Sequence, residues 1–222
     1  RGAIDCHIHA YPDFVHRSQN MIEIAIEASK CGMRAVAFKD HWNVSATAAY
    51  LTQKHIDSLV KRGELEHPGV KVYGGAGTCH GMNVEYIRVA LQYPNFKMIW
   101  FPTFTSLGFW RGAGQPEKGG VQLVAENGEV LPEVVEIMKM AAEKKVGIGF
   151  GHTDFQELLP LAKLAKKLGV RATLDHPLLE LNKLLIDEMK ELAELGVYVG
   201  TYCQPMIPSL YQPVADPMET IR

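Results

Sequence analysis

Short apolar segments alternate with helical segments along the whole chain, and this alternation constrains the fold more than any other feature of the sequence. Each apolar segment is followed by a stretch of helical periodicity or by a loop. Parallel strands need a crossover connection, usually a helix, so repeated strand–helix units indicate a parallel sheet. The sequence therefore predicts an α/β protein. The expected strands are residues 3–8, 34–39, 70–76, 97–104, 146–150, 170–174 and 197–201.

The segments between these strands carry helix signals. Ser18 or Asn20 can open the first helix and Gly32 can close it, as capping residues do. Pro132 stands at the first position of another helix, where proline is favoured. The expected helices are residues 21–31, 45–62, 84–92, 132–145 and 155–168, with a further apolar stripe from Leu184 to Leu195.

Polar residues decide between a closed barrel and an open sheet, because the near-continuous apolar strands fit both. The deciding residues are five histidines that each follow an apolar run: His7, His9, His41, His152 and His176. In a (β/α) barrel the carboxyl ends of all strands meet at one rim, where such enzymes do their chemistry. No glycine-rich phosphate loop follows the first strand, which argues against a nucleotide-binding open sheet. We expect a single TIM-like barrel domain over residues 1–222, with seven strands visible.

The end of the sequence suggests a longer protein. Asp216-Pro217 has the pattern of a helix start, and only six residues follow Asp216. We expect an eighth strand beyond Arg222 that carries an aspartate at its carboxyl end.

The segment from Thr105 to Leu131 is the one long irregular stretch. Glu126-Asn127-Gly128-Glu129 lies between two apolar runs, which indicates a β-hairpin. Long loops inside compact domains are often lids. We expect this segment to be a mobile lid, with Phe109 and Trp110 as exposed apolar side chains that close over the site.

Composition narrows the class of protein. The formal charge of −2 gives no basis for binding nucleic acid or an anionic membrane, and no apolar run is long enough to span a bilayer. There is no signal-peptide pattern. The four cysteines form no CxxC motif and are interpreted as reduced thiols. We expect a cytoplasmic protein that acts on a small-molecule substrate and that can form a homo-oligomer.

The first strand ends in a potential metal site, within the stretch Ile4-Asp5-Cys6-His7-Ile8-His9. Side chains alternate along a strand, so Asp5, His7 and His9 lie on one face. Two imidazoles about 7 Å apart along a strand can reach one metal ion. Pro12 cannot continue a strand, so these histidines lie at its carboxyl end.

Three short motifs, IDCHIHAYPD, GHTD and LDHP, resemble those of the amidohydrolase superfamily. The resemblance implies a barrel with one or two divalent ions, Zn²⁺ or another such as Mn²⁺. It implies water activated for attack on a small amide, ester or lactone. It also implies His7, His9, His152 and His176 as metal ligands. The catalytic aspartate that the superfamily carries on strand eight has no counterpart in this sequence.

Lys39 and His41 lie two residues apart and thus on one face of the second strand, with Asp40 opposite. A lysine inside a barrel is costly unless it is paired or modified. Lys39 could therefore be a carboxylated metal ligand, or it could pair with Asp5 or an anion. We interpret Asp5, His41 and His176 as candidate catalytic residues.

Two other functions stay open. The stretch AFKDHW resembles the second motif of the PHP phosphoesterases, which are seven-stranded barrels with an Asp-His pair on strand two. A barrel that binds metal without catalysis is the third interpretation.

Supporting roles are also expected for residues near the candidate ligands. Asp154, Glu157 and Asp175 would fix the tautomers of neighbouring histidines, and Arg111 and Tyr202 would orient substrate. His16, His55 and His67 are expected to be solvated.

Overall fold

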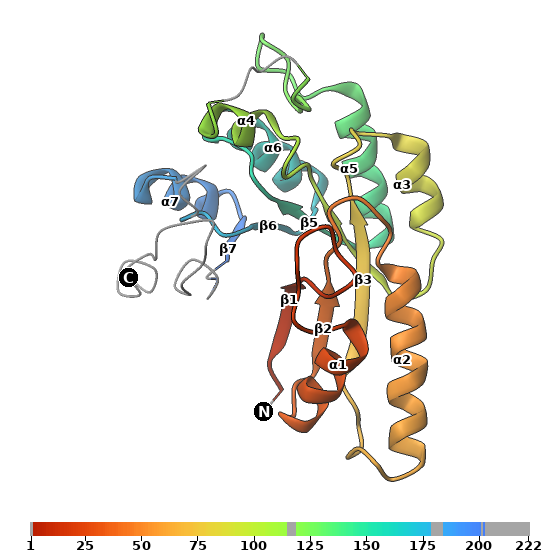
Figure 1. Ribbon diagram of the computed structural model, residues 1–222. Helices are drawn as coiled ribbons and strands as arrows, with labels where there is room; N and C mark the ends of the chain where they lie inside the picture. Colours follow the sequence, from red (N-terminus) through yellow and green to blue (C-terminus); the bar gives the residue numbers. More distant parts are fainter. Residues whose placement is uncertain (1, 115–118, 179–183, 201, 203–222) are drawn as a thin grey trace. The chain divides into compact units, whose positions relative to one another are not determined.

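The computed structural model describes residues 2–114, 119–178, 184–200 and 202 (Figure 1). The chain divides into two compact units, and each has its own core. The first unit comprises residues 1–77 and 85–98, and the second comprises residues 78–84 and 99–222. The single barrel domain expected over residues 1–222 stays a prediction. None of the described helices is long and apolar enough to cross a membrane.

The first unit alternates strands and helices in the predicted order. The elements lie close to the expected ranges, and their bounds are β1 Ile4–Ile8, α1 Met21–Lys30, β2 Ala35–Phe38, α2 Ala46–Lys61 and β3 Lys71–Gly77. Helix α3 (Val84–Ala90) and strand β4 (Phe96–Trp100) follow, and both straddle the boundary between the units.

The second unit continues the alternation. Its elements are α4 Leu107–Gly112, α5 Pro132–Lys144, β5 Gly147–Phe150, α6 Phe155–Leu168, β6 Ala172–Leu174, α7 Ile186–Glu194 and β7 Tyr198–Val199. Its core consists of apolar side chains from α5, α6, β5 and β6, which include Ile137, Met138, Ile148, Phe150, Leu158 and Leu161.

The seven strands follow one another in sequence order along the sheet, from β1 to β7. In the first unit β1 pairs in parallel with β2, with Asp5 opposite Val36, and β2 pairs in parallel with β3. In the second unit β5 pairs in parallel with β6, with Ile148 opposite Ala172, and β6 pairs in parallel with β7. This is the topology of a TIM-like (β/α) barrel with seven strands, so the predicted fold class is confirmed.

Local sequence explains where the elements begin and pack. Asn20 caps α1, because its side chain accepts hydrogen bonds from the N–H groups of Ile22 and Glu23. The side chain of Glu23 in turn accepts a hydrogen bond from the backbone N–H of Asn20.

The core of the first unit combines α1, β2, α2 and β3, and its members include Ala25, Ala28, Val36, Phe38, Ala49, Ile56, Leu59 and Val72.

The structure differs from the sequence prediction in two places. Strand β4 ends at Trp100, four residues earlier than expected, and the segment 105–131 contains the short helix α4. The hairpin around Gly128 is confirmed, because Val124 bridges Val130 and the N–H of Ala125 donates to the carbonyl of Glu129 at 2.8 Å. Asp216-Pro217 lies outside the described residues.

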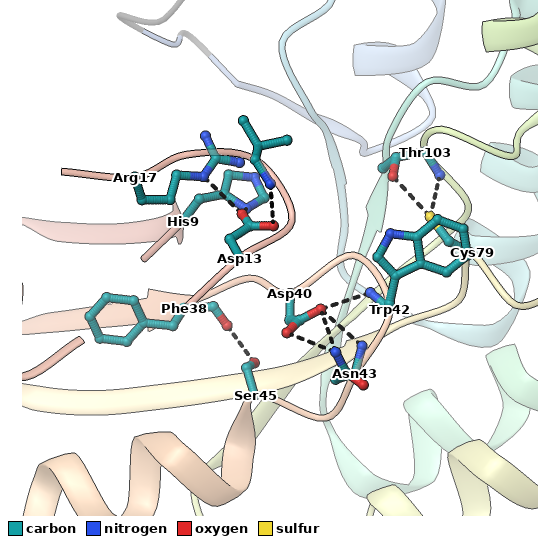
Figure 2. Close-up of polar contacts among 11 residues, drawn as sticks. His9, Asp13, Arg17, Phe38, Asp40, Trp42, Asn43, Ser45, Cys79 and Thr103 are labelled. Atoms are coloured by element: carbon teal, nitrogen blue, oxygen red, sulfur yellow. Dashed lines mark hydrogen bonds and ion pairs between the residues drawn. The ribbon is translucent and has the colours of Figure 1, made fainter. Parts of the chain in front are cut away.

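Ser45 joins the ends of β2 and β3 to the start of α2. Its buried hydroxyl donates to the carbonyl of Phe38 at 2.6 Å (Figure 2). The same hydroxyl accepts from the N–H of Gly75 at 2.9 Å. The backbone N–H of Ser45 also donates to the carbonyl of Gly75 at 2.9 Å. Ser45 therefore fixes the carboxyl end of β2, where Lys39 and His41 begin the next loop.

We expect Ser45→Ala to lower the free energy of unfolding by about 1–3 kcal/mol, because buried polar groups on two strands lose their partner. Urea unfolding of the full chain measures this loss. The control is Thr47→Ala, which removes an exposed hydroxyl bonded only to the nearby carbonyl of Val44, and which should change stability by less than about 0.5 kcal/mol. Equal effects of the two substitutions would contradict the role given to Ser45.

Candidate functional site

The residues predicted from the sequence fall into two sets, one in each unit. Asp5, His7, His9, Lys39 and His41 belong to the first unit, and His152 and His176 belong to the second. Asp5 and His7 lie within β1, and the others follow the carboxyl ends of β1, β2, β5 and β6 by one to three residues. Their convergence on one rim stays a prediction.

His7, His9 and His41 form a histidine cluster in the first unit. The ring centroids of His7 and His9 lie 5.2 Å apart, edge to face, and those of His9 and His41 lie 4.4 Å apart, stacked. Phe14 meets the ring of His41 edge to face at 5.8 Å. The parallel pairing of β1 with β2 produces this cluster, since it places His41 beside the end of β1.

Lys39 and Asp40 take different positions in the same loop. Lys39 is buried, and its backbone N–H donates to the carbonyl of Ile8 at 2.8 Å. The carboxylate of Asp40 accepts from the N–H groups of Trp42 and Asn43 at 2.8 and 2.9 Å, so it stabilises the turn (Figure 2). Asp5 is exposed, and its carboxylate accepts from the backbone N–H of His7 at 3.0 Å.

Burial lowers the pKa of His9 well below its usual value, and the neighbouring His41, His7, Lys39 and Arg17 lower it further. His9 is therefore neutral near pH 7. Its Nδ1 is buried and has no hydrogen-bond partner among the described residues, and Oδ2 of Asp13 lies 3.8 Å away. A neutral imidazole with a free nitrogen is the form of histidine that binds metals.

Asp13 and Arg17 are neighbours of His9 that the sequence analysis missed. Nε of Arg17 donates to Oδ2 of Asp13 at 2.8 Å (Figure 2). An acid and a base four residues apart, just after the HxH motif, are the signal that could have revealed them. The loop that holds them folds back on β1, because the N–H of Tyr11 donates to the carbonyl of Gln19 at 2.8 Å.

The donor chemistry of the histidine cluster fits a divalent ion such as zinc, since imidazole nitrogen is a preferred zinc ligand. The free Nδ1 of His9 supports this fit. In the described part of the chain, no group of three or more His, Cys, Asp or Glu side chains is arranged to hold a metal ion. A metal would therefore need side-chain rearrangement or additional ligands.

The second unit brings His152 and His176 together, with ring centroids 4.9 Å apart. Tyr202 meets His176 edge to face at 5.6 Å, and its hydroxyl donates to Oδ1 of Asp175 at 3.0 Å. Thr173 donates to the same oxygen at 3.0 Å. Asp175 thus fixes Tyr202 against His176.

Two unusual backbone features accompany this arrangement, one at Gly149 and one at His176. A Cβ on Gly149 would lie 2.6 Å from the indole of Trp100 and 2.9 Å from Oδ2 of Asp175, so only glycine allows this close approach. His176 has a φ of +35°, which side-chain-bearing residues rarely adopt. Such strained residues persist only where surrounding contacts hold them, and they concentrate at functional sites.

The segment 105–131 packs on His152. Ser106 donates from its hydroxyl to the carbonyl of His152 at 2.6 Å, and the ring of Phe109 stacks on the imidazole with centroids 5.2 Å apart. Phe109 and Trp110 are half-buried, so the expectation of exposed lid side chains is wrong. Whether the segment moves as a lid stays a prediction.

Three supporting residues have partners other than those expected. Asp154 caps α6 and pairs with Arg111, so Arg111 holds the segment 105–131 to α6. Glu157 is buried, and its Oε1 accepts from the N–H groups of Leu123 and Val124 at 2.7 and 3.1 Å. Arg111 and Asp154 border a pocket of about 510 Å³ in the second unit, between α4, α6 and α7.

Glu157 generates a pH-dependent prediction. Burial raises the pKa of its carboxyl, against the effect of the two N–H donors. An acid with a raised pKa in the folded state binds its proton more tightly there than in the unfolded chain. Its effect on stability is therefore absent well below pH 4.5, and it becomes destabilising as the pH rises above 4.5.

We expect Glu157→Gln, which keeps the accepting oxygen and removes the charge, to gain stability over the native chain as the pH rises from about 4.5 to 7. Urea unfolding at several pH values measures the difference. Glu143→Gln, at an exposed position on α5, is the control and should show no such trend. A difference that is constant with pH would contradict the assignment.

No curated protein matches the chain. Among solved structures, an amidohydrolase 2 from Bifidobacterium longum subsp. infantis is 18% identical, covers 89% of this chain and 72% of its own, and has a TM-score of 0.46. A "putative alpha-L-fucosidase" from Bacteroides thetaiotaomicron is 15% identical, covers 88% of this chain and 74% of its own, and has a TM-score of 0.39.

The family comparison covers nearly the whole described chain, because one family model matches residues 2–200. The chain belongs to this family, which is the Family of unknown function (DUF6282).

Proposed function

We propose that this protein is a metal-dependent hydrolase that acts on a small amide, ester or lactone. The observation that carries the proposal is the histidine cluster of the first unit, in which His7 and His9 share one strand and His41 stacks on His9. The resemblance to amidohydrolases adds His152 and His176 to the candidate ligands, and the buried position of Lys39 adds a carboxylated lysine. The expected ion is Zn²⁺, or another such as Mn²⁺, with one or two per chain.

A bound divalent ion would supply a water of lowered pKa and would polarise the bond to be cleaved. The residues of the chain have separate tasks. His9 is neutral because it is desolvated, so it can donate a nitrogen lone pair without first losing a proton. His41 stacks on His9 and restricts its ring. Asp5 is exposed, and its carboxylate can take up a proton from water.

A phosphoesterase of the PHP type is the second candidate. The contact between His9 and His41 favours it, because it joins the HxH motif of β1 to the Asp-His pair after β2. The carboxylate of Asp40, however, accepts from two backbone N–H groups in its own turn. A metal-binding protein without catalysis is the third candidate, and it would retain metal but turn over none of the substrate classes.

We expect the full chain, purified without a histidine tag, to contain a divalent metal ion, and we expect His7→Ala/His9→Ala to lose most of it. The reason is that removing two imidazoles leaves too few ligands for tight binding. Elemental analysis by mass spectrometry measures ions per chain. The control is His55→Ala, which removes an exposed imidazole from α2 in the same unit. Unchanged metal content in the double variant would exclude His7 and His9 as ligands.

Activity distinguishes the three candidates. The metal-loaded protein would be tested on matched nitrophenyl esters, lactones, anilides and nitrophenyl phosphate. Hydrolysis of carboxylic substrates that is lost in the double variant supports the hydrolase, and hydrolysis of the phosphate alone supports the phosphoesterase. Bound metal with no turnover of any of the four classes would argue against both enzymes.

A further inference from the structure

We propose that Arg17 binds an oxyanion, a carboxylate or phosphate group of the substrate, beside the histidine cluster. The inference builds on the proposed function, since it assigns a chemical class to the substrate of that site. The carboxylate and phosphate classes share the same recognition chemistry, because a planar guanidinium can donate two parallel hydrogen bonds to either group.

Arg17 is held in place by Asp13. Its Nε donates to Oδ2 of Asp13 at 2.8 Å, and Oδ1 of Asp13 accepts from the N–H of Val15 at 3.3 Å. Asp13 is only 10% exposed and Arg17 25% exposed, so the pair is not a freely solvated surface contact. A guanidinium fixed in this way loses little further side-chain entropy when it binds a ligand.

Most N–H groups of the Arg17 guanidinium are still available to bind a ligand. A guanidinium carries five N–H groups, and the bond to Asp13 uses only the one on Nε. Within the described residues, the side chain of Arg17 makes no other hydrogen bond or ion pair. The two terminal nitrogens can therefore donate to a ligand while Nε stays on Asp13.

Arg17 lies beside the histidine cluster. The loop after β1 folds back so that Tyr11 bridges Asn20, and Figure 2 shows Asp13 and Arg17 next to the ring of His9. Arg17 and His9 approach the same oxygen, because Oδ2 of Asp13 lies 2.8 Å from Nε of Arg17 and 3.8 Å from Nδ1 of His9. A ligand that contacts the ring of His9 therefore comes close to the guanidinium of Arg17.

The carboxylates in this part of the first unit already accept hydrogen bonds. Asp13 is bonded to Arg17, and Asp40 accepts from the N–H groups of Trp42 and Asn43. Asp5 accepts from the backbone N–H of His7. An incoming anion is thus the group that complements the remaining N–H groups of Arg17.

The test uses the full chain after treatment with chelator, so that an anion cannot bind through a metal. The probes are inorganic phosphate, acetate and, as a neutral isostere, acetamide, at constant ionic strength. Binding of phosphate is followed by ³¹P NMR line width, and binding of acetate and acetamide by ligand-observed ¹H NMR. The variants are Arg17→Gln and Arg17→Lys, with circular dichroism as the check on folding.

The matched control is Arg88→Gln. Arg88 also belongs to the first unit and also pairs through Nε with a carboxylate, that of Glu85, at 3.1 Å, but it lies on α3 away from β1. We expect Arg17→Gln to weaken binding of the anion about tenfold or more, Arg17→Lys to weaken it less, and Arg88→Gln to leave it unchanged. Acetamide should not bind.

The outcomes separate this inference from the proposed function. Phosphate binding without acetate binding assigns the phosphate class, and the reverse assigns carboxylates. Arg17-dependent anion binding by the chelator-treated protein would support this inference, and absence of metal from the protein as purified would separately defeat the metal proposal. Equal anion affinity in the native chain and in both folded Arg17 variants, or no anion binding by the native chain at tens of millimolar, would overturn the role of Arg17.

Discussion

The parallel pairing of β1 with β2 is the constraint on which the first unit's site depends. Parallel strands end at the same edge of a sheet, so the residues that follow them become neighbours without any sequence proximity. Here the pairing brings His41 onto His9 across 32 positions of the chain, and Ser45 ties the end of β2 to β3. The chemistry of the cluster is thus a direct product of strand register.

The fold could be predicted because the apolar segments and helix caps are local signals, and most element ends fall within two residues of expectation. The misses have physical causes. Helix α4 is only six residues long, too short for helical periodicity to show. Phe109 looked exposed because its partner, His152, lies 43 positions away. The positions of the histidines could be predicted from the ends of the apolar strands. The contacts of Glu157 could not be predicted, because its partners are backbone N–H groups of a distant loop.

Buried ionisable groups are costly, and this protein retains several near its candidate sites. Lys39, Glu157 and Asp175 are all buried, although each would be better solvated at the surface. For Glu157 the structural reason is clear, because its oxygen accepts two N–H groups that would otherwise be buried without partners. Asp175 likewise fixes Thr173 and Tyr202.

Charge balance links the metal proposal to the role of Arg17. Neutral imidazoles contribute no negative charge, so a divalent ion on the histidine cluster would add two positive charges beside Lys39 and the neutral ion pair of Arg17 with Asp13. Such a concentration of charge in a partly buried place is unfavourable unless anions compensate it. Asp13 is already neutralised by Arg17, and Asp5 is exposed. A substrate oxyanion on Arg17 would supply the missing charge, so metal and anion should each strengthen the binding of the other.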